Sequence, residues 1–328
     1  MFPFTRLQRL RQNHSLKNLV RETHLNPDKL ILPLFIKDGI GIKKPIDSLT
    51  GHYQFSLDQL DSEIKLIKAL GIKGIILFGI PAKKDALGSE SFSDTGIIQK
   101  AIPIIKHSAP NLIVITDVCF CEYTNHGHCG IIKSNHFDQV ILDNDQTLLY
   151  LAKQAVSHAK AGADIIAPSG NIDGMVQAIR IALDGAGFTQ IPILSYAVKY
   201  ASSLYGPFRQ AAEGAPQFGD RSSYQMDYGN AYEALRECEL DIAEGADMLM
   251  VKPAHTYLDI IYRVKKTYPA LPLCAYQTSG EFAYLKAAAE KGWLVEDEAI
   301  IEVLTAIKRA GADFIVTYFA KTIAERLE

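Results

Sequence analysis

The sequence has no hydrophobic run of the length that a membrane span needs, and it has no excess of charge of one sign. A transmembrane helix needs roughly 20 consecutive apolar residues, so we expect no membrane span. The formal net charge of −3 gives no reason to expect nucleic acid or an anionic membrane as a partner. No apolar signal core follows the N-terminal residues 1–6. We therefore expect a soluble, cytoplasmic protein.

Cysteine is also scarce, and its distribution excludes one class of small secreted protein. The chain has five cysteines, an odd number, and three of them crowd together as Cys119, Cys121 and Cys129. This pattern argues against a disulfide framework. Cys238 and Cys274 lie in helix-like and strand-like patterns, and we expect both in the core.

Two lysines stand at the ends of short apolar runs. Residues 248–251 lead to Lys252, and Pro253 then indicates that the strand ends. Lys199 follows a similar run at residues 192–198. A buried lysine loses its proton easily, two neighbouring cations lower each other's pKa, and the neutral amine is a nucleophile. The pattern predicts imine formation with a carbonyl substrate, although a lysine that leaves a sheet for solvent is the alternative.

Apolar runs recur along the chain, and most intervals between them hold helix-like patterns. The runs are at residues 31–36, 72–78, 112–118, 164–167, 193–197, 248–251, 273–276 and 314–318. A repeated Gly-Ala-Asp at residues 162–164, 245–247 and 311–313 ends a helix and leads into a strand. Repeated strand–helix units predict a (β/α)8 TIM barrel with its active groups on the C-terminal loops. A doubly wound open sheet is the second choice, but no G-x-G-x-x-G follows the first strand.

Residues 1–28 lack these repeated apolar runs. They are basic and polar and cannot form a hydrophobic core alone. Scattered leucines give them some apolar surface to bury. We expect an N-terminal arm over residues 1–28 that packs on another subunit, and a catalytic barrel domain over residues 29–328. A frayed tail is the alternative for the arm.

The cysteine cluster follows the third predicted strand and lies beside two histidines, His126 and His128. Three thiolates suit zinc, and a fourth position left open is typical of a working metal site. Buried cysteines without a metal are the alternative.

Further polar residues occupy other predicted strand ends. Arg209 and Arg221 lie in a long loop, residues 200–230, whose length is typical of a lid. They can bind a carboxylate or phosphate, although solvated surface arginines are common. Ser279 opens a helix and can bind an anion or cap the helix, and Tyr318 follows the last strand. Residues 56–59 predict a capping box at the start of another helix.

Several of these motifs, in this order, resemble the 5-aminolevulinate dehydratase (porphobilinogen synthase) family. The resemblance runs from about Arg9 to the C-terminus. It includes residues 31–35, the cysteine motif at 117–129, Val-Lys-Tyr-Ala-Ser-Ser at 198–203, Tyr-Gly-Pro-Phe-Arg at 205–209, Met-Val-Lys-Pro at 250–253, Ser-Gly-Glu at 279–281 and residues 309–313.

The resemblance implies condensation of two 5-aminolevulinate molecules to porphobilinogen, with loss of two waters, in tetrapyrrole (haem) biosynthesis. It assigns one Schiff base to Lys252 and the other to Lys199. It also implies an octamer in which the N-terminal arm holds a neighbour. The remaining assignments are Arg209, Arg221 and Gln225 for one substrate carboxylate, Ser279 and Tyr318 for the other, Cys119, Cys121 and Cys129 for zinc, and Glu237 for an allosteric magnesium.

One departure from the family touches the site, because Gly170 stands where aspartate is usual. A lysine-dependent class I aldolase on the same barrel is a rival interpretation, but it leaves Lys199 and the cysteines unexplained. A non-catalytic zinc-binding barrel is another, and it predicts metal binding without imine trapping.

Overall fold

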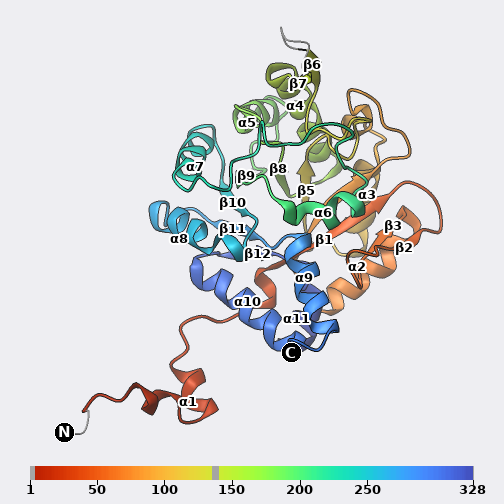
Figure 1. The fold of residues 1–328 in the computed structure, drawn as a ribbon. Helices are drawn as coiled ribbons and strands as arrows, with labels where there is room; N and C mark the ends of the chain where they lie inside the picture. The colour runs from red at the N-terminus through yellow and green to blue at the C-terminus, as the bar shows by residue number, and fades with distance from the viewer. Residues whose placement is uncertain (1–3, 135–139, 328) are drawn as a thin grey trace.

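The computed structural model describes residues 4–134 and 140–327, and its central feature is a barrel of parallel strands surrounded by helices (Figure 1). The strand order is β8-β5-β4-β1-β12-β11-β10-β9. A parallel bridge between Ile166 and Ile193 brings the two ends of this sheet together. The barrel strands are β1 (Leu30–Lys37), β4 (Gly74–Ile80), β5 (Ile113–Val118), β8 (Ile165–Pro168), β9 (Leu194–Lys199), β10 (Met248–Lys252), β11 (Leu273–Tyr276) and β12 (Phe314–Val316). Each predicted strand is present, and the TIM barrel prediction is confirmed.

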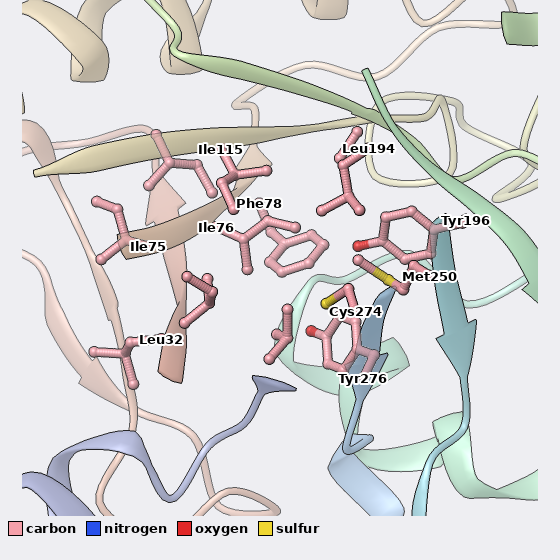
Figure 2. Close-up of a cluster of buried hydrophobic side chains, with 14 of the residues drawn as sticks. Leu32, Ile75, Ile76, Phe78, Ile115, Leu194, Tyr196, Met250, Cys274 and Tyr276 are labelled. Atoms are coloured by element: carbon pink, nitrogen blue, oxygen red, sulfur yellow. The ribbon is translucent and has the colours of Figure 1, made fainter. Parts of the chain in front are cut away.

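The strands read as continuous apolar runs because helices cover their outer faces while side chains fill the interior. Every residue of β4 and β9 is buried, as expected for a parallel sheet covered on both sides. Figure 2 shows Ile76, Leu194, Met250 and Cys274 among the buried side chains that meet between the strands. This packing holds the strand ends, and the polar groups on them, in fixed positions.

Helices connect the strands, and several end where the sequence predicts. The α-helices after the N-terminal segment are α2 (Leu60–Ala69), α3 (Ile97–Ser108), α4 (Asn144–Ala161), α5 (Met175–Gly185), α6 (Gly206–Ala211), α7 (Glu233–Ala243), α8 (Leu258–Thr267), α9 (Ser279–Glu290), α10 (Glu296–Ala310) and α11 (Ala320–Leu327). The repeated glycines Gly162, Gly245 and Gly311 have φ of 103°, 104° and 128°, which favours glycine after α4, α7 and α10.

A helix does begin after Ser56, as the short 3₁₀ helix η3 (Leu57–Gln59) that leads into α2, but the predicted capping hydrogen bonds at residues 56–59 are absent. The Ser56 hydroxyl accepts a hydrogen bond from the Ile42 N–H (2.8 Å) and donates one to Asp58 (2.6 Å), so it caps no helix. A capping box does occur at the start of α9, where Thr278 and Glu281 exchange hydrogen bonds.

Some elements were not foreseen from the sequence. Two short hairpins, β2 (Lys43–Pro45) with β3 (Tyr53–Phe55) and β6 (Ile132–Ser134) with β7 (Val140–Leu142), have too few residues to show a pattern. The predicted loop at 200–230, called the lid segment below, contains the short helix α6. Pro207 suits the first turn of this helix because its missing N–H would have no helical partner there.

The N-terminal segment lies apart from the barrel (Figure 1). Its short helices are η1 (Leu7–Arg11) and α1 (His14–Leu19), and neither buries a residue. Leu7 and Leu19 are 69% and 81% exposed. These exposed leucines suit the predicted contact with another subunit, which stays a prediction; residues 1–3 of the arm lie outside the described residues. Among the described residues, no helix is both long and apolar enough to cross a membrane.

Candidate active site

The two lysines lie side by side at the C-terminal mouth of the barrel. Lys199 ends β9, Lys252 ends β10, and the register of these parallel strands pairs the two residues directly. Both side chains are buried, at 5% and 6% exposure. The structure therefore brings together two amines that are separated by more than fifty residues of sequence.

Aromatic rings surround the amine of Lys252. Its Nζ lies 4.0 Å from the centre of the Tyr276 ring, 5.2 Å from that of Phe208 and 5.3 Å from those of Tyr196 and Tyr205. Burial, and then the charge of Lys199, lowers the pKa of Lys252 to about 7. A sizeable fraction of neutral amine is thus present near neutral pH, as a nucleophile requires.

A carboxyl and a serine lie next to Lys199. The Lys199 amine donates to the Ser169 carbonyl, and the Ser169 hydroxyl donates to Asp117 (3.0 Å). Burial, and then the charge of Glu122, raises the pKa of Asp117 to about 7, although both lysines oppose this rise. Asp117 can therefore hold or release a proton close to the amine.

Asp117 and Ser169 have no role in the sequence-based prediction, but a signal for both was present. Asp117 lies near the end of one predicted strand and Ser169 just past the end of the next, the position where barrel enzymes place reacting groups. Tyr196 was missed because it lies inside a run that reads as core. Only the closed barrel shows that its ring lies within 6 Å of both lysine amines.

The three clustered cysteines converge on one buried point. The Sγ atoms of Cys119, Cys121 and Cys129 lie within 4.8 Å of one another, and all three are free thiols. Gln154 donates to the Cys119 carbonyl (3.1 Å) and so helps to fix the loop. A compact set of three sulfur donors fits zinc or another soft metal, so the cluster could hold such an ion.

The neighbouring histidines are engaged elsewhere. His128 uses Nδ1 with the Tyr224 hydroxyl and Nε2 with the Phe218 carbonyl, each at 3.1 Å. His126 uses Nε2 with the Ala86 carbonyl (3.3 Å) and Nδ1 with the N–H of His128. Two carboxylates are nearer candidates than the histidines, because the ligand atoms of Asp117, Glu122 and Cys119 lie within 4.8 Å of one another.

The lid segment brings two arginines toward the same mouth. Arg221 is buried and donates from Nη2 to the carbonyls of Gly127 (2.8 Å) and Gly214 (2.6 Å). Arg209, on α6, is half-buried; desolvation and then the charge of Arg221 lower its pKa. Two cations this close favour an anion between them. Gln225 is also buried, and its N–H bonds the Arg221 carbonyl (2.9 Å).

Ser279 and Tyr318 lie on the Lys252 side of the mouth. The Tyr318 hydroxyl is 3.4 Å from that of Tyr276, whose ring contacts the Lys252 amine. The Ser279 hydroxyl accepts a hydrogen bond from the Phe208 N–H (2.9 Å), so the lid helix α6 reaches this group too. The Ser279/Tyr318 group and the lid segment are therefore in direct contact.

Glu237 lies on α7, and the cavity that it lines is also lined by Tyr196 and Gln225 of the mouth. It lines a cavity of about 400 Å³ together with Asp173, Glu233, Asp241 and Glu244. Burial, and then the charges of Asp173 and Glu233, raise the pKa of Glu237. A cation bound among these carboxylates would reduce the repulsion between their charges.

Gly170, the departure from the family, has limited room for a side chain. A Cβ at this position would lie 3.0 Å from Cγ1 of Ile172 and 3.6 Å from the Cys129 carbonyl oxygen. The space that an aspartate would use is thus partly filled by Ile172.

Known proteins resemble this chain over nearly its whole length. The profile of the family described as delta-aminolevulinic acid dehydratase matches residues 4–326. A delta-aminolevulinic acid dehydratase of Halalkalibacterium halodurans is 54% identical over 99% of this chain and 97% of its own length. The enzyme of that name from Synechocystis is also 54% identical, over the full length of both chains.

A solved structure has the same fold. The delta-aminolevulinic acid dehydratase (porphobilinogen synthase) of Toxoplasma gondii, in complex with the reaction product porphobilinogen, superposes with a TM-score of 0.94. It is 41% identical, and the match covers 98% of this chain and 91% of that one.

Proposed function

Because the chain belongs to the delta-aminolevulinic acid dehydratase family, we propose that it condenses two 5-aminolevulinate molecules to porphobilinogen, releasing two waters. The observation that carries this proposal is the pairing of Lys199 with Lys252 at the ends of neighbouring strands, beside three thiols. Two keto-acid substrates require two amines, and an aldolase with one lysine would need neither Lys199 nor the cysteines.

In this proposal each amine attacks the ketone carbon of one substrate, and water leaves as the imine forms. Lys252 reacts as the neutral amine, since burial and Lys199 lower its pKa. Asp117 accepts a hydrogen bond from the Ser169 hydroxyl, and the Ser169 carbonyl accepts one from the Lys199 amine. Asp117 donates a proton to the hydroxyl that leaves as water, and it takes a proton back in a later step. The aromatic rings around Lys252 exclude water that would hydrolyse the imine.

We propose zinc as the metal held by Cys119, Cys121 and Cys129. The support is the all-sulfur donor set and the engagement of both nearby histidines with other partners. When bound there, zinc supplies a Lewis acid for the amine or carbonyl of one substrate.

We assign magnesium to Glu237 as an allosteric ion, and its support is the carboxylate-lined cavity around this residue. An octamer held by the N-terminal arm is likewise our proposal, supported by the exposed leucines of that arm. A cytoplasmic location agrees with the five free thiols, since reducing compartments preserve them.

A direct test measures porphobilinogen by its colour reaction after the zinc-loaded protein is incubated with 5-aminolevulinate. Borohydride reduction with substrate present, followed by intact mass, reports the imine separately. A non-catalytic zinc-binding barrel would bind the metal but give neither product nor trapped adduct, and that result would overturn the proposal.

The arginines should serve one substrate and the Ser279/Tyr318 group the other. In Arg209→Ala or Arg221→Ala we expect apparent KM to rise roughly ten- to a hundredfold, the equivalent of about 1.5–3 kcal/mol for a charged hydrogen bond. Lys252 should still form its adduct, because these variants keep the aromatic rings and the Lys199 amine that lie beside it. Borohydride trapping mapped by peptide mass checks this, and complete loss of label from Lys252 would place the arginines in the first site instead.

A further inference from the structure

The lid segment carries a glutamate, Glu213, to which the proposed reaction assigns no role. Its backbone has φ of 52°, in the left-handed region that residues other than glycine rarely adopt. Its carboxylate accepts hydrogen bonds from the Lys37 amine and from Gln54 (3.2 Å). A residue other than glycine keeps this backbone conformation only where surrounding contacts stabilise it, which indicates that the contacts of Glu213 have a role.

Glu213 lies where the two arginine-bearing parts of the lid meet. The next residue, Gly214, donates its N–H to the Arg209 carbonyl (3.1 Å). The Gly214 carbonyl accepts a hydrogen bond from Arg221 (2.6 Å). A displacement of residue 213 would therefore move the groups that orient both arginines.

Three side chains of the barrel mouth hold this junction. Lys37 ends β1 and pairs with the Glu213 carboxylate, while Lys84, in the loop after β4, donates to the Glu213 carbonyl. Gln54 of β3 donates to the carbonyl of Ala211 (2.8 Å) as well as to Glu213. The junction is thus fixed to the barrel by both its side chain and its backbone.

The same junction rests against the cysteine loop. A Cβ at Gly214 would lie 3.0 Å from the carbonyl oxygen of Cys121, and one at Gly127 would lie 2.2 Å from that of Ala215. Residues 214–215 and the cysteine loop therefore approach closely through their backbones. The lid segment therefore packs against the loop of the proposed metal site as well as against the barrel.

We infer that Glu213 is a positioning residue, which fastens the lid over the mouth of the barrel so that Arg209 and Arg221 meet the substrate carboxylate. This inference rests on the proposed function, because it takes those arginines as substrate ligands. Glu213 acts through the arginines and touches no reacting atom.

The test is Glu213→Asn, because asparagine tolerates the left-handed backbone but is too short and uncharged to pair with Lys37. We expect KM for 5-aminolevulinate to rise roughly twofold to fivefold, the size suited to a partly exposed ion pair, while kcat changes less. Hydrogen exchange of residues 206–225, measured without substrate, should become faster than in the wild type.

The second variant is made at Lys37, the ion-pair partner of Glu213. Lys37→Met should change KM and exchange in the same direction, and the double variant Glu213→Asn/Lys37→Met should be no worse than Glu213→Asn alone. Glu296→Gln is the matched control, since its pair with Lys286 has side-chain exposures of 35% and 21%, against 39% and 24% for Glu213 and Lys37. It should leave KM and lid exchange unchanged.

Wild-type exchange in the lid and unchanged KM in Glu213→Asn would overturn the inference. Equal effects of Glu213→Asn and Glu296→Gln would do so too, because they would indicate a general loss of stability. Failure of the proposed function is distinguishable: the wild type itself would then yield no porphobilinogen, while the exchange of the lid would still report whether Glu213 fastens it.

Discussion

Replacement of Lys252 by alanine or arginine should abolish porphobilinogen formation. Alanine has no amine, and arginine stays protonated and cannot form the imine. No neighbour can substitute, because Lys199 already pairs with the Ser169 carbonyl and serves the other substrate in our proposal. The measurement is product formation together with borohydride trapping, and near-native activity of Lys252→Arg would refute the imine mechanism.

The pH dependence of trapping gives an independent check on Lys252. Its neutral form is the reactive one and its pKa is lowered to about 7, so the rate of adduct formation should fall about tenfold per unit as pH drops below 7. An ordinary exposed lysine would show this dependence up to much higher pH. Lys106→Arg is a suitable control, because Lys106 is paired with Asp164 outside the mouth and should keep full activity.

The barrel was predictable because its signal is periodic and repeated. Every strand is a short apolar run, and the glycines at 162, 245 and 311 mark helix ends with a backbone that favours glycine. The register that pairs Lys199 with Lys252 is a property of the closed sheet, but the strand-end position of each lysine was enough to place both at one mouth.

Other parts of the site depend on contacts between distant segments, and the sequence alone could not provide them. Ser56 has the spacing of a capping box, yet its hydroxyl accepts a hydrogen bond from the N–H of Ile42, directly before a hairpin that was not foreseen. Glu213 reads as a solvated residue in a loop, and its role depends on Lys37, which lies 176 residues away. Tyr196 reads as core, and only the folded barrel places its ring beside two amines.

Removal of the cysteine cluster is the second change that should eliminate turnover. In the triple variant Cys119→Ala/Cys121→Ala/Cys129→Ala we expect loss of one tightly bound zinc per subunit and a fall in activity of about 10³-fold or more, since a Lewis acid contributes several kcal/mol. Chelation of the wild type should have the same effect and added zinc should reverse it. Air oxidation should resemble chelation, because it removes the thiolates that bind the metal.

The other two cysteines provide the control for this prediction. Cys238 and Cys274 are buried and free like the cluster, but they lie in α7 and β11 and join no group of metal ligands among the described residues. Cys238→Ala should therefore keep its zinc and most of its activity, and chelation should still inactivate it. Full activity of the triple variant, with its zinc content lost, would show that the metal is not required and that the two lysines suffice. Full zinc content would instead show that the metal binds elsewhere, since the three sulfurs are the soft ligands that the barrel gathers at its mouth.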